Sequence, residues 1–198
     1  MPFAAKSPVR WQRFHRKRPI SGDALTTKIG FGGGCHWCTE AVFSVLHGVD
    51  CVEQGFIAAS APDDRYSEAV IVHFDPDKIS TETLIEIHLR THASTSNHKM
   101  RGKYRSAIYV FNEQQLTNVK SDLLTVTNQL DIAPVTQVLR FCSFKASDER
   151  YQNYFEKNAD GPFCRSYIDP KFDFLRTKFR AQLRPDFQSA DIAKGVEA

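Results

Sequence analysis

The chain has 198 residues, 41% of them hydrophobic, and a formal net charge of +3. This size and composition predict one globular domain with a sizeable core. No hydrophobic run approaches the roughly 20 residues that cross a membrane, and no apolar signal-peptide core follows Met1. We therefore expect a cytoplasmic protein without membrane contact, whose cysteines are reduced and chemical rather than a disulfide framework.

The first elements in chain order are a basic extension over residues 1–23, a buried strand at 27–32 and a helix from 37 to about 46. The extension has six basic residues and no acidic one before Asp23. We interpret it as a solvated extension, with nucleic-acid binding as the less favoured alternative.

The rest of the chain continues the alternation of strands and helices. Extended segments are predicted at 52–59, 68–74, 105–111 and 136–144. Helices are predicted from 81, after a Ser80 cap, and over 113–130, 147–157 and 171–183. This alternation predicts a layered α/β or α+β domain over residues 24–184, followed by a loose tail at 185–198.

The most informative segment is Gly33-Gly34-Cys35-His36-Trp37-Cys38, between the first strand and the first helix. Free N–H groups and the dipole at a helix N-terminus stabilise a thiolate at Cys35. Cys38 stands one helical turn further on, close enough to trap an oxidised product. The spacing also fits half of a zinc site, but no second Cys or His pair follows, so we expect no metal and no cofactor.

Other residues are candidates for supporting chemistry. If the start of its strand lies near that helix N-terminus, Glu68 could donate a proton to a reacting oxygen. Tyr66 and Tyr104 are possible hydroxyl donors. Cys164 lies in a turn-rich segment, which suits a mobile resolving thiol, whereas Cys51 and Cys142 are expected to be inert packing.

Four motifs in order over residues 27–165 resemble the A-type peptide methionine sulfoxide reductases. The segment from Phe31 to Trp37 resembles that family's Gly-Cys-Phe-Trp-Gly signature. The other three matches are Glu68-Ala69-Val70 with Phe74-Asp75-Pro76, Tyr104 to Tyr109, and Gln152 to Tyr154 with Lys157-Asn158 and Gly161 to Cys164.

The resemblance implies a fold and a set of roles. The fold would be a two-layer, ferredoxin-like plait around a mixed sheet. Cys35 would attack a sulfoxide sulfur and become a sulfenic acid, Glu68 would protonate the oxygen and Tyr104 would hydrogen-bond it. Trp37 would form a wall of the methyl pocket. Cys164 would resolve the sulfenic acid, and a thioredoxin-like reductant would reduce the resulting disulfide.

The departures from the family pattern lie around the substrate. His36 replaces a phenylalanine and makes one expected pocket wall polar, Cys38 replaces a glycine, and Lys99 replaces an aspartate. The segment before Glu68 is short and lacks a second active-site tyrosine, unless Tyr66 replaces it. The substrate is therefore predicted only as methionine sulfoxide or a related small sulfoxide.

Two alternatives to a sulfoxide reductase remain at this point. A Cys35/Cys38 thiol–disulfide oxidoreductase would leave Glu68 and Trp37 without a role. A redox sensor would show no turnover with any sulfoxide. Within the reductase hypothesis, Cys38 is favoured by proximity as the first resolving thiol and Cys164 by resemblance.

Overall fold

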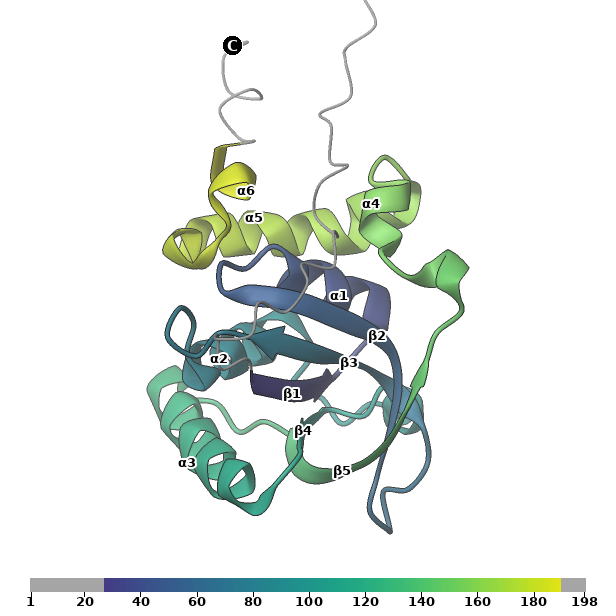
Figure 1. The fold of residues 1–198 in the computed structure, drawn as a ribbon, viewed down its shortest axis with the longest axis vertical. Coiled ribbons are helices and arrows are strands. Elements are labelled where there is room, and N and C mark those ends of the chain that lie inside the picture. The colour runs from purple at the N-terminus through teal and green to yellow at the C-terminus, as the bar shows by residue number, and fades with distance from the viewer. Residues whose placement is uncertain (1–26, 190–198) are drawn as a thin grey trace, which may run out of the picture.

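The computed structural model describes residues 27–189, so the predicted extension at 1–23 and the end of the predicted tail lie outside the described residues. Its centre is a closed five-strand barrel in the order β1-β3-β2-β5-β4 (Figure 1). The strands are β1 (Thr27–Gly32), β2 (Val49–Ala59), β3 (Ser67–Phe74), β4 (Ala107–Val110) and β5 (Gln137–Ala146). Only β4 and β5 pair in parallel, so the sheet is mixed, as predicted.

Closure of the barrel differs from the predicted ferredoxin-like plait, whose open sheet has two free edges. Strand β1 pairs with β3 along one side and with β4 along the other. Glycines permit this close approach: a Cβ on Gly30 would lie 2.9 Å from Tyr109 Cβ, and one on Gly32 would lie 2.9 Å from the Arg105 carbonyl oxygen. The strands themselves are predictable from the sequence, but their closure depends on pairing between distant segments.

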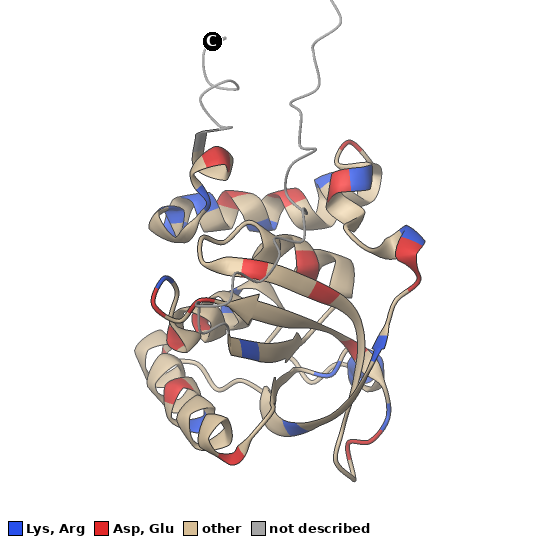
Figure 2. Ribbon diagram, viewed as in Figure 1, with Lys and Arg blue, Asp and Glu red and all other residues tan. Residues whose placement is uncertain are grey.

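Within residues 27–189, six α-helices cover the barrel: α1 (His36–Ser44), α2 (Thr81–Thr91), α3 (Glu113–Leu130), α4 (Tyr154–Asn158), α5 (Asp169–Lys178) and α6 (Pro185–Ser189). Helix α2 begins at the predicted cap, where the Ser80 hydroxyl accepts the Thr83 N–H at 3.1 Å. Figure 1 shows α4, α5 and α6 above α1, and α2 and α3 at the left of the barrel. Acidic and basic residues are interspersed over these helices (Figure 2).

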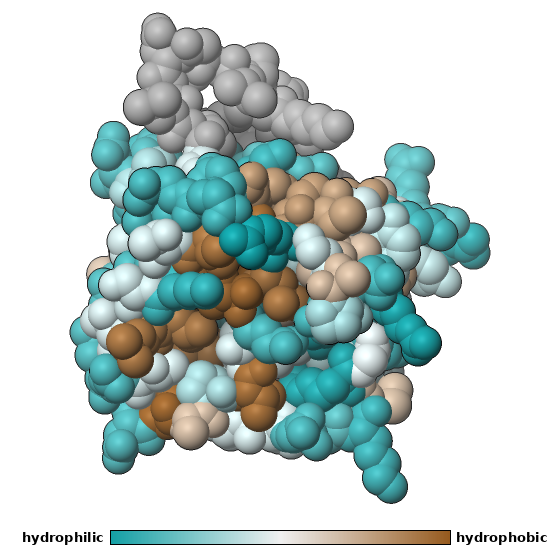
Figure 3. All heavy atoms as spheres, turned by 90° about the horizontal axis from the view of Figure 1, so that it is seen from below, coloured by the Kyte–Doolittle hydropathy of each residue, from teal (hydrophilic) through white to brown (hydrophobic). Residues whose placement is uncertain are grey.

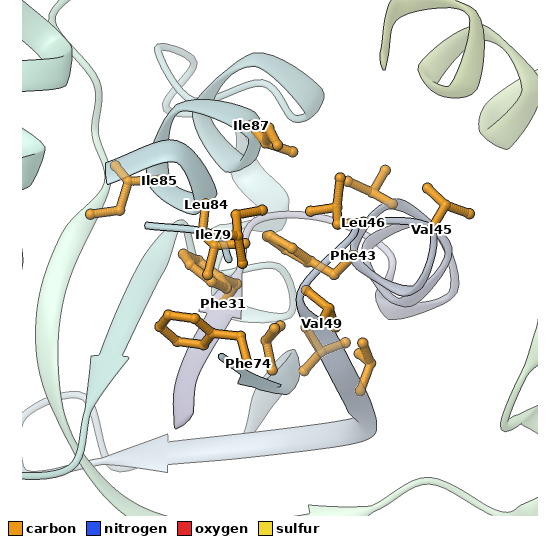
Figure 4. Close-up of a cluster of buried hydrophobic side chains, with 14 of the residues drawn as sticks. Phe31, Phe43, Val45, Leu46, Val49, Phe74, Ile79, Leu84, Ile85 and Ile87 are labelled. Atoms are coloured by element: carbon orange, nitrogen blue, oxygen red, sulfur yellow. The ribbon is translucent and has the colours of Figure 1, made fainter. Parts of the chain in front are cut away.

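Two apolar clusters hold the layers together. The larger cluster joins α1 and α2 to the sheet through Phe31, Phe43, Phe74 and neighbouring aliphatic side chains (Figure 4). The smaller cluster contains Ile57, Ala59, Ala69, Ile71, Ala107 and Tyr109. Successive side chains of β3 belong alternately to the two clusters, so this strand is buried along nearly its whole length. Seen from below, an apolar patch lies within a hydrophilic surface (Figure 3).

The helix predicted over 147–157 is interrupted. A 3₁₀ turn at Glu149–Tyr151 and helix α4 flank Asn153, whose φ is 53°. The buried Glu40 carboxylate accepts the backbone N–H groups of Asn153 at 2.9 Å and Tyr154 at 3.2 Å. Because a side chain from α1 satisfies these donors, the backbone does not need a continuous helix here.

The packed chain also continues past the predicted boundary at residue 184. Helix α6 begins at Pro185, and Phe187 in it is fully buried against Phe172, with ring centroids 4.8 Å apart. The predicted loose tail therefore includes a segment that belongs to the core. Within residues 27–189, no helix has the length and apolar character needed to cross a bilayer.

Candidate active site

Cys35 occupies the position that the glycine turn predicts, as the N-cap of α1 with φ −59° and ψ 125°. The turn packs closely on α2 and the loop that follows it: a Cβ on Gly33 would lie 2.5 Å from the ring of His92. Any side chain at position 33 would require the turn or the His92 ring to move. The turn that carries Cys35 is therefore in close contact with the end of α2.

The surroundings of Cys35 lower the pKa of its thiol, in the direction that the sequence predicts. The largest cause is a hydrogen bond from the Cys38 thiol. The backbone N–H groups of Trp37 and Cys38 act in the same sense, while burial and the negative charge of Glu68 oppose them. The thiolate is thus stabilised by donors from the first turn of α1.

Cys38 is the member of this pair whose pKa is shifted upward. Its side chain is buried, and the hydrogen bond to Cys35, followed by burial, raises its pKa. Its sulfur also lies 4.0 Å from the Tyr167 carbonyl oxygen. The ammonium of Lys171, which donates to the Thr91 carbonyl, favours a Cys38 thiolate, and the nearby Cys164 opposes one.

Cys164 is placed differently from the prediction of a mobile loop. It begins a π-helical turn, Cys164–Ile168, which runs directly into α5, and its side chain is fully buried. Burial raises the pKa of its thiol. Cys51 and Cys142, expected to be packed inside, are exposed, and all five cysteines are free of disulfides.

Glu68 lies beside the helix N-terminus, as the sequence analysis required of a proton donor. Its side chain is buried at the start of β3, and its Oε2 accepts the His36 backbone N–H at 3.1 Å. Its Oε1 lies 3.3 Å from the Lys103 ammonium. Lys103 is not predictable from the sequence, because only the fold brings it to the Glu68 carboxyl group.

His36 and Trp37 follow Cys35 directly in the chain but do not line the cleft in front of it. The His36 ring is buried, and its Nδ1 lies 2.9 Å from the Gly55 carbonyl oxygen. The Trp37 ring stacks on Tyr154, with centroids 4.0 Å apart, and meets Phe163 edge-on at 5.2 Å. The first two side chains of α1 therefore contact neighbouring elements, and Trp37 in particular anchors α1 to α4.

The cleft in front of Cys35 has a volume of about 670 Å³. Its lining includes Gly34, Cys35, Cys38, His92, Tyr104 and Lys171. Tyr104 is thus brought to the nucleophile, with the Lys103 ammonium 4.9 Å above its ring. Tyr66 is not: it is half exposed, and its hydroxyl bonds Ser143 Oγ at 3.0 Å.

These groups can perform thiol chemistry with an acid close by. Cys35 supplies a stabilised thiolate, Cys38 a neighbouring thiol, and Glu68 a carboxyl group near Cys35. Among residues 27–189, no group of three or more His, Cys, Asp or Glu side chains is arranged to hold a metal ion.

Comparison with known proteins identifies the family of this arrangement. A model of the peptide methionine sulfoxide reductase family matches residues 27–183. The chain is 31% identical over 164 residues to the peptide methionine sulfoxide reductase MsrA of Acinetobacter baumannii (strain AYE), which covers 76% of this chain and 94% of that protein.

Two solved structures share its fold. Methionine sulfoxide reductase A of Corynebacterium diphtheriae superposes with a TM-score of 0.60 and 23% identity, over 71% of this chain and 78% of that one. Mxr1 from Saccharomyces cerevisiae, in complex with Trx2, superposes with a TM-score of 0.51 and 17% identity, over 65% and 84%. The family match and the sequence identity show that the chain belongs to the peptide methionine sulfoxide reductase family.

Proposed function

We propose that this chain reduces methionine sulfoxide, or a related small sulfoxide, by thiol chemistry at Cys35. The observation that carries the proposal is that the Cys35 thiol, with its lowered pKa, and the buried Glu68 carboxyl meet at the N-terminus of α1. A nucleophile with a proton donor close to it is what reduction of an S–O bond requires.

The first step transfers oxygen from the substrate to Cys35. The thiolate and one proton react with the sulfoxide, the S–O bond of the substrate breaks, and Cys35 leaves the step as a sulfenic acid while the sulfide is released. Glu68 delivers the proton to the oxygen. Tyr104, which lines the cleft, donates a hydrogen bond to the same oxygen.

The second step removes the oxygen as water. Cys38 attacks the sulfenic sulfur, a Cys35–Cys38 disulfide forms, and the Cys38 proton leaves with the hydroxyl group. The hydrogen bond between the two thiols supports Cys38 as the first resolving residue. The thiol of Cys164, which is buried near Cys38, then attacks the Cys38 sulfur. A Cys38–Cys164 disulfide forms, the Cys35 thiol is released, and the new disulfide is the one that the external reductant reduces.

The third step needs an external dithiol. We assign this role to a thioredoxin-like protein, because the similar yeast structure holds Mxr1 in complex with Trx2. The reductant is oxidised to a disulfide, and the thiols of this chain are restored.

The test is a single turnover without added reductant, with methionine sulfoxide, a peptide methionine sulfoxide and a dialkyl sulfoxide. One equivalent of sulfide should form with the parent protein and none with Cys35→Ser. Full turnover by Cys35→Ser would refute the assignment of the nucleophile. Peptide mapping of the product should find Cys35 linked to Cys38. A Cys35–Cys164 link that forms equally fast in Cys38→Ser would refute the order of the thiols.

Disulfide exchange is the second candidate, favoured by the thiol–thiol hydrogen bond itself. A thioredoxin-like enzyme would reduce insulin disulfides in a reaction that does not need Glu68. The two functions are therefore distinguished by whether Glu68→Gln loses sulfoxide turnover.

A further inference from the structure

The orientation of the His36 ring is fixed by the backbone of β2. Its Nδ1 lies 2.9 Å from the Gly55 carbonyl oxygen, which can only accept, so Nδ1 carries the hydrogen. The ring is 6% exposed, and Phe56 meets it edge-on with centroids 5.2 Å apart. The other ring nitrogen, Nε2, is therefore the atom at which His36 gains or loses a proton.

That nitrogen faces the proposed proton donor. His36 Nε2 lies 3.9 Å from Glu68 Oε2, and both side chains are buried. A neutral Nε2 and an ionised carboxylate would direct lone pairs at each other in a region with little water, whereas one proton between them converts repulsion into attraction. The separation exceeds a direct hydrogen bond, so transfer needs a closer approach or a bridging water.

The charged groups around His36 are Glu68, on β3, and Lys103, before β4, and Glu68 also interacts with the Cys35 thiolate at the start of α1. The Lys103 ammonium lies 3.3 Å from Glu68 Oε1, and its side chain is 56% exposed. Lys103 thus connects the buried carboxyl group with solvent, while His36 closes the other side. Burial lowers the pKa of His36, and the negative charge of Glu68 opposes this shift.

Resting on the proposed function, we propose that His36 and Glu68 hold one proton between them, and that this proton is the one delivered to the sulfoxide oxygen. Before the reaction, the proton moves from His36 Nε2 to Glu68 Oε2. In the reaction it passes to the substrate oxygen as the S–O bond breaks, leaving neutral His36 and a Glu68 carboxylate. Solvent then returns one proton to the pair by way of Lys103. His36 is a positioning residue, because it acts through Glu68.

The consequence is a characteristic pH dependence. An isolated carboxyl group has an ordinary pKa near 4.3 and would carry almost no proton at neutral pH. Two neighbouring bases that share a proton keep it to higher pH, and their titration belongs to the pair. The decline of the rate on the alkaline side should therefore report this pair, and it should move when the imidazole is removed.

The experiment measures single-turnover reduction of methionine sulfoxide from pH 5 to pH 9. The parent is compared with His36→Phe, which keeps a ring of similar shape, and His36→Gln, which keeps a polar group that does not titrate. The control is His73→Phe, since His73 also faces a glutamate, Glu53, at 2.6 Å but lies at the exposed end of β3. Iodoacetamide alkylation of Cys35 over the same range separates the titration of the thiol.

In both His36 variants, the pH at which the single-turnover rate declines should be lower by about one unit or more. At a pH above this decline, the rate should then be about tenfold lower than that of the parent. KM and Cys35 alkylation should stay close to those of the parent, as should the pH profile of His73→Phe. An unmoved decline in folded His36→Phe and His36→Gln overturns the inference, whereas a parent without turnover overturns the proposed function instead.

A second measurement does not require a His36 variant to fold. In histidine NMR titrations, the midpoint of His36 should move between the parent and Glu68→Gln, while that of His73 should stay in place. A His36 midpoint that is the same in both proteins shows that the two groups share no proton.

Discussion

The backbone N–H of His36 donates to the Glu68 carboxylate at 3.1 Å, so the first residue of the nucleophile's helix is bonded to the start of β3. This contact fixes the distance between the sulfur and the acid through the backbone. It also places the negative charge of Glu68 close enough to Cys35 to oppose the thiolate. Glu68 therefore acts on Cys35 in two ways, through position and through charge.

The two effects separate in Glu68→Gln. We expect single-turnover sulfoxide reduction to fall by about 10²–10⁴-fold, the usual contribution of a general acid. Cys35 alkylation should remain, with the pKa of the thiol slightly lower, because the opposing charge is gone. Stopped-flow turnover and iodoacetamide kinetics on the same sample measure both. A near-parent turnover rate would favour disulfide exchange as the function.

The stability of the Cys35 thiolate should depend on Cys38. In Cys38→Ala the largest favourable interaction of Cys35 is lost, while the helix N–H groups stay. We expect the pKa of Cys35 to rise above that of a free thiol, which is about 8.5, because burial and Glu68 then outweigh the two backbone N–H groups. The pH dependence of alkylation measures it, with Cys164→Ala as control. An unchanged pKa would mean that the helix N-terminus alone stabilises the thiolate.

The effects of substitutions at Gly33 and His92 on the free energy of unfolding should be strongly coupled. Gly33→Ala places a methyl group against the His92 ring, and we expect loss of unfolding free energy and disturbed Cys35 alkylation. In the Gly33→Ala, His92→Ala double variant the overlap is gone, so the two losses should sum to more than the measured total. Urea unfolding of all four proteins gives the coupling. Additive losses would contradict close packing of this turn.

His92 also predicts a loss of stability in acid. Burial lowers its pKa from 6.5 to about 4, so the unfolded chain binds a proton over this range that the folded chain does not. The free energy of unfolding should therefore fall as pH decreases from about 6.5 to about 4, by on the order of 3 kcal/mol from this residue. Buried His88 acts in the same direction. Urea midpoints of the parent and His92→Gln measure the contribution, and equal pH slopes would contradict it.

The break at Asn153 predicts the role of Glu40. Glu40→Ala leaves the N–H groups of Asn153 and Tyr154 and the Gln54 amide without their acceptor. We expect a loss of more than about 2 kcal/mol, because unsatisfied buried donors cost about 1–3 kcal/mol each. Glu40→Gln, which keeps one acceptor oxygen, should lose less. Equal losses in both variants would show that the charge, not the acceptor, matters.

Local signals predicted much of this fold. The glycine turn placed Cys35 at a helix start, Ser80 capped α2, and alternation marked β3, because each depends on residues adjacent in the chain. Barrel closure, the interruption at Asn153 and the burial of Cys164 depend on contacts with distant segments such as Tyr109 and Glu40. No pattern within a short window contains them.

The site shows the same division. Cys35 and Cys38 were identifiable from their spacing. Glu68 was identifiable from its position at the start of a strand, although the sequence did not show which elements lie beside that strand. Lys103 escaped because a lysine next to a tyrosine is ordinary unless the carboxyl group that it faces is visible. Tyr66 was assigned to the site by its residue type, yet it lies between β2 and β3, and its hydroxyl bonds Ser143.

Barrel closure also limits how a peptide substrate can be held. Each described strand has a partner on both sides for part of its length, so an edge is open only where the registers are offset, as at residues 49–53 of β2, which pair with β3 but not with β5. None of the described strands contributes a residue to the lining of the Cys35 cleft, so a sulfoxide side chain that enters the cleft gains no backbone pairing with the sheet. Recognition then falls to the groups around Cys35, and it should tolerate many flanking sequences.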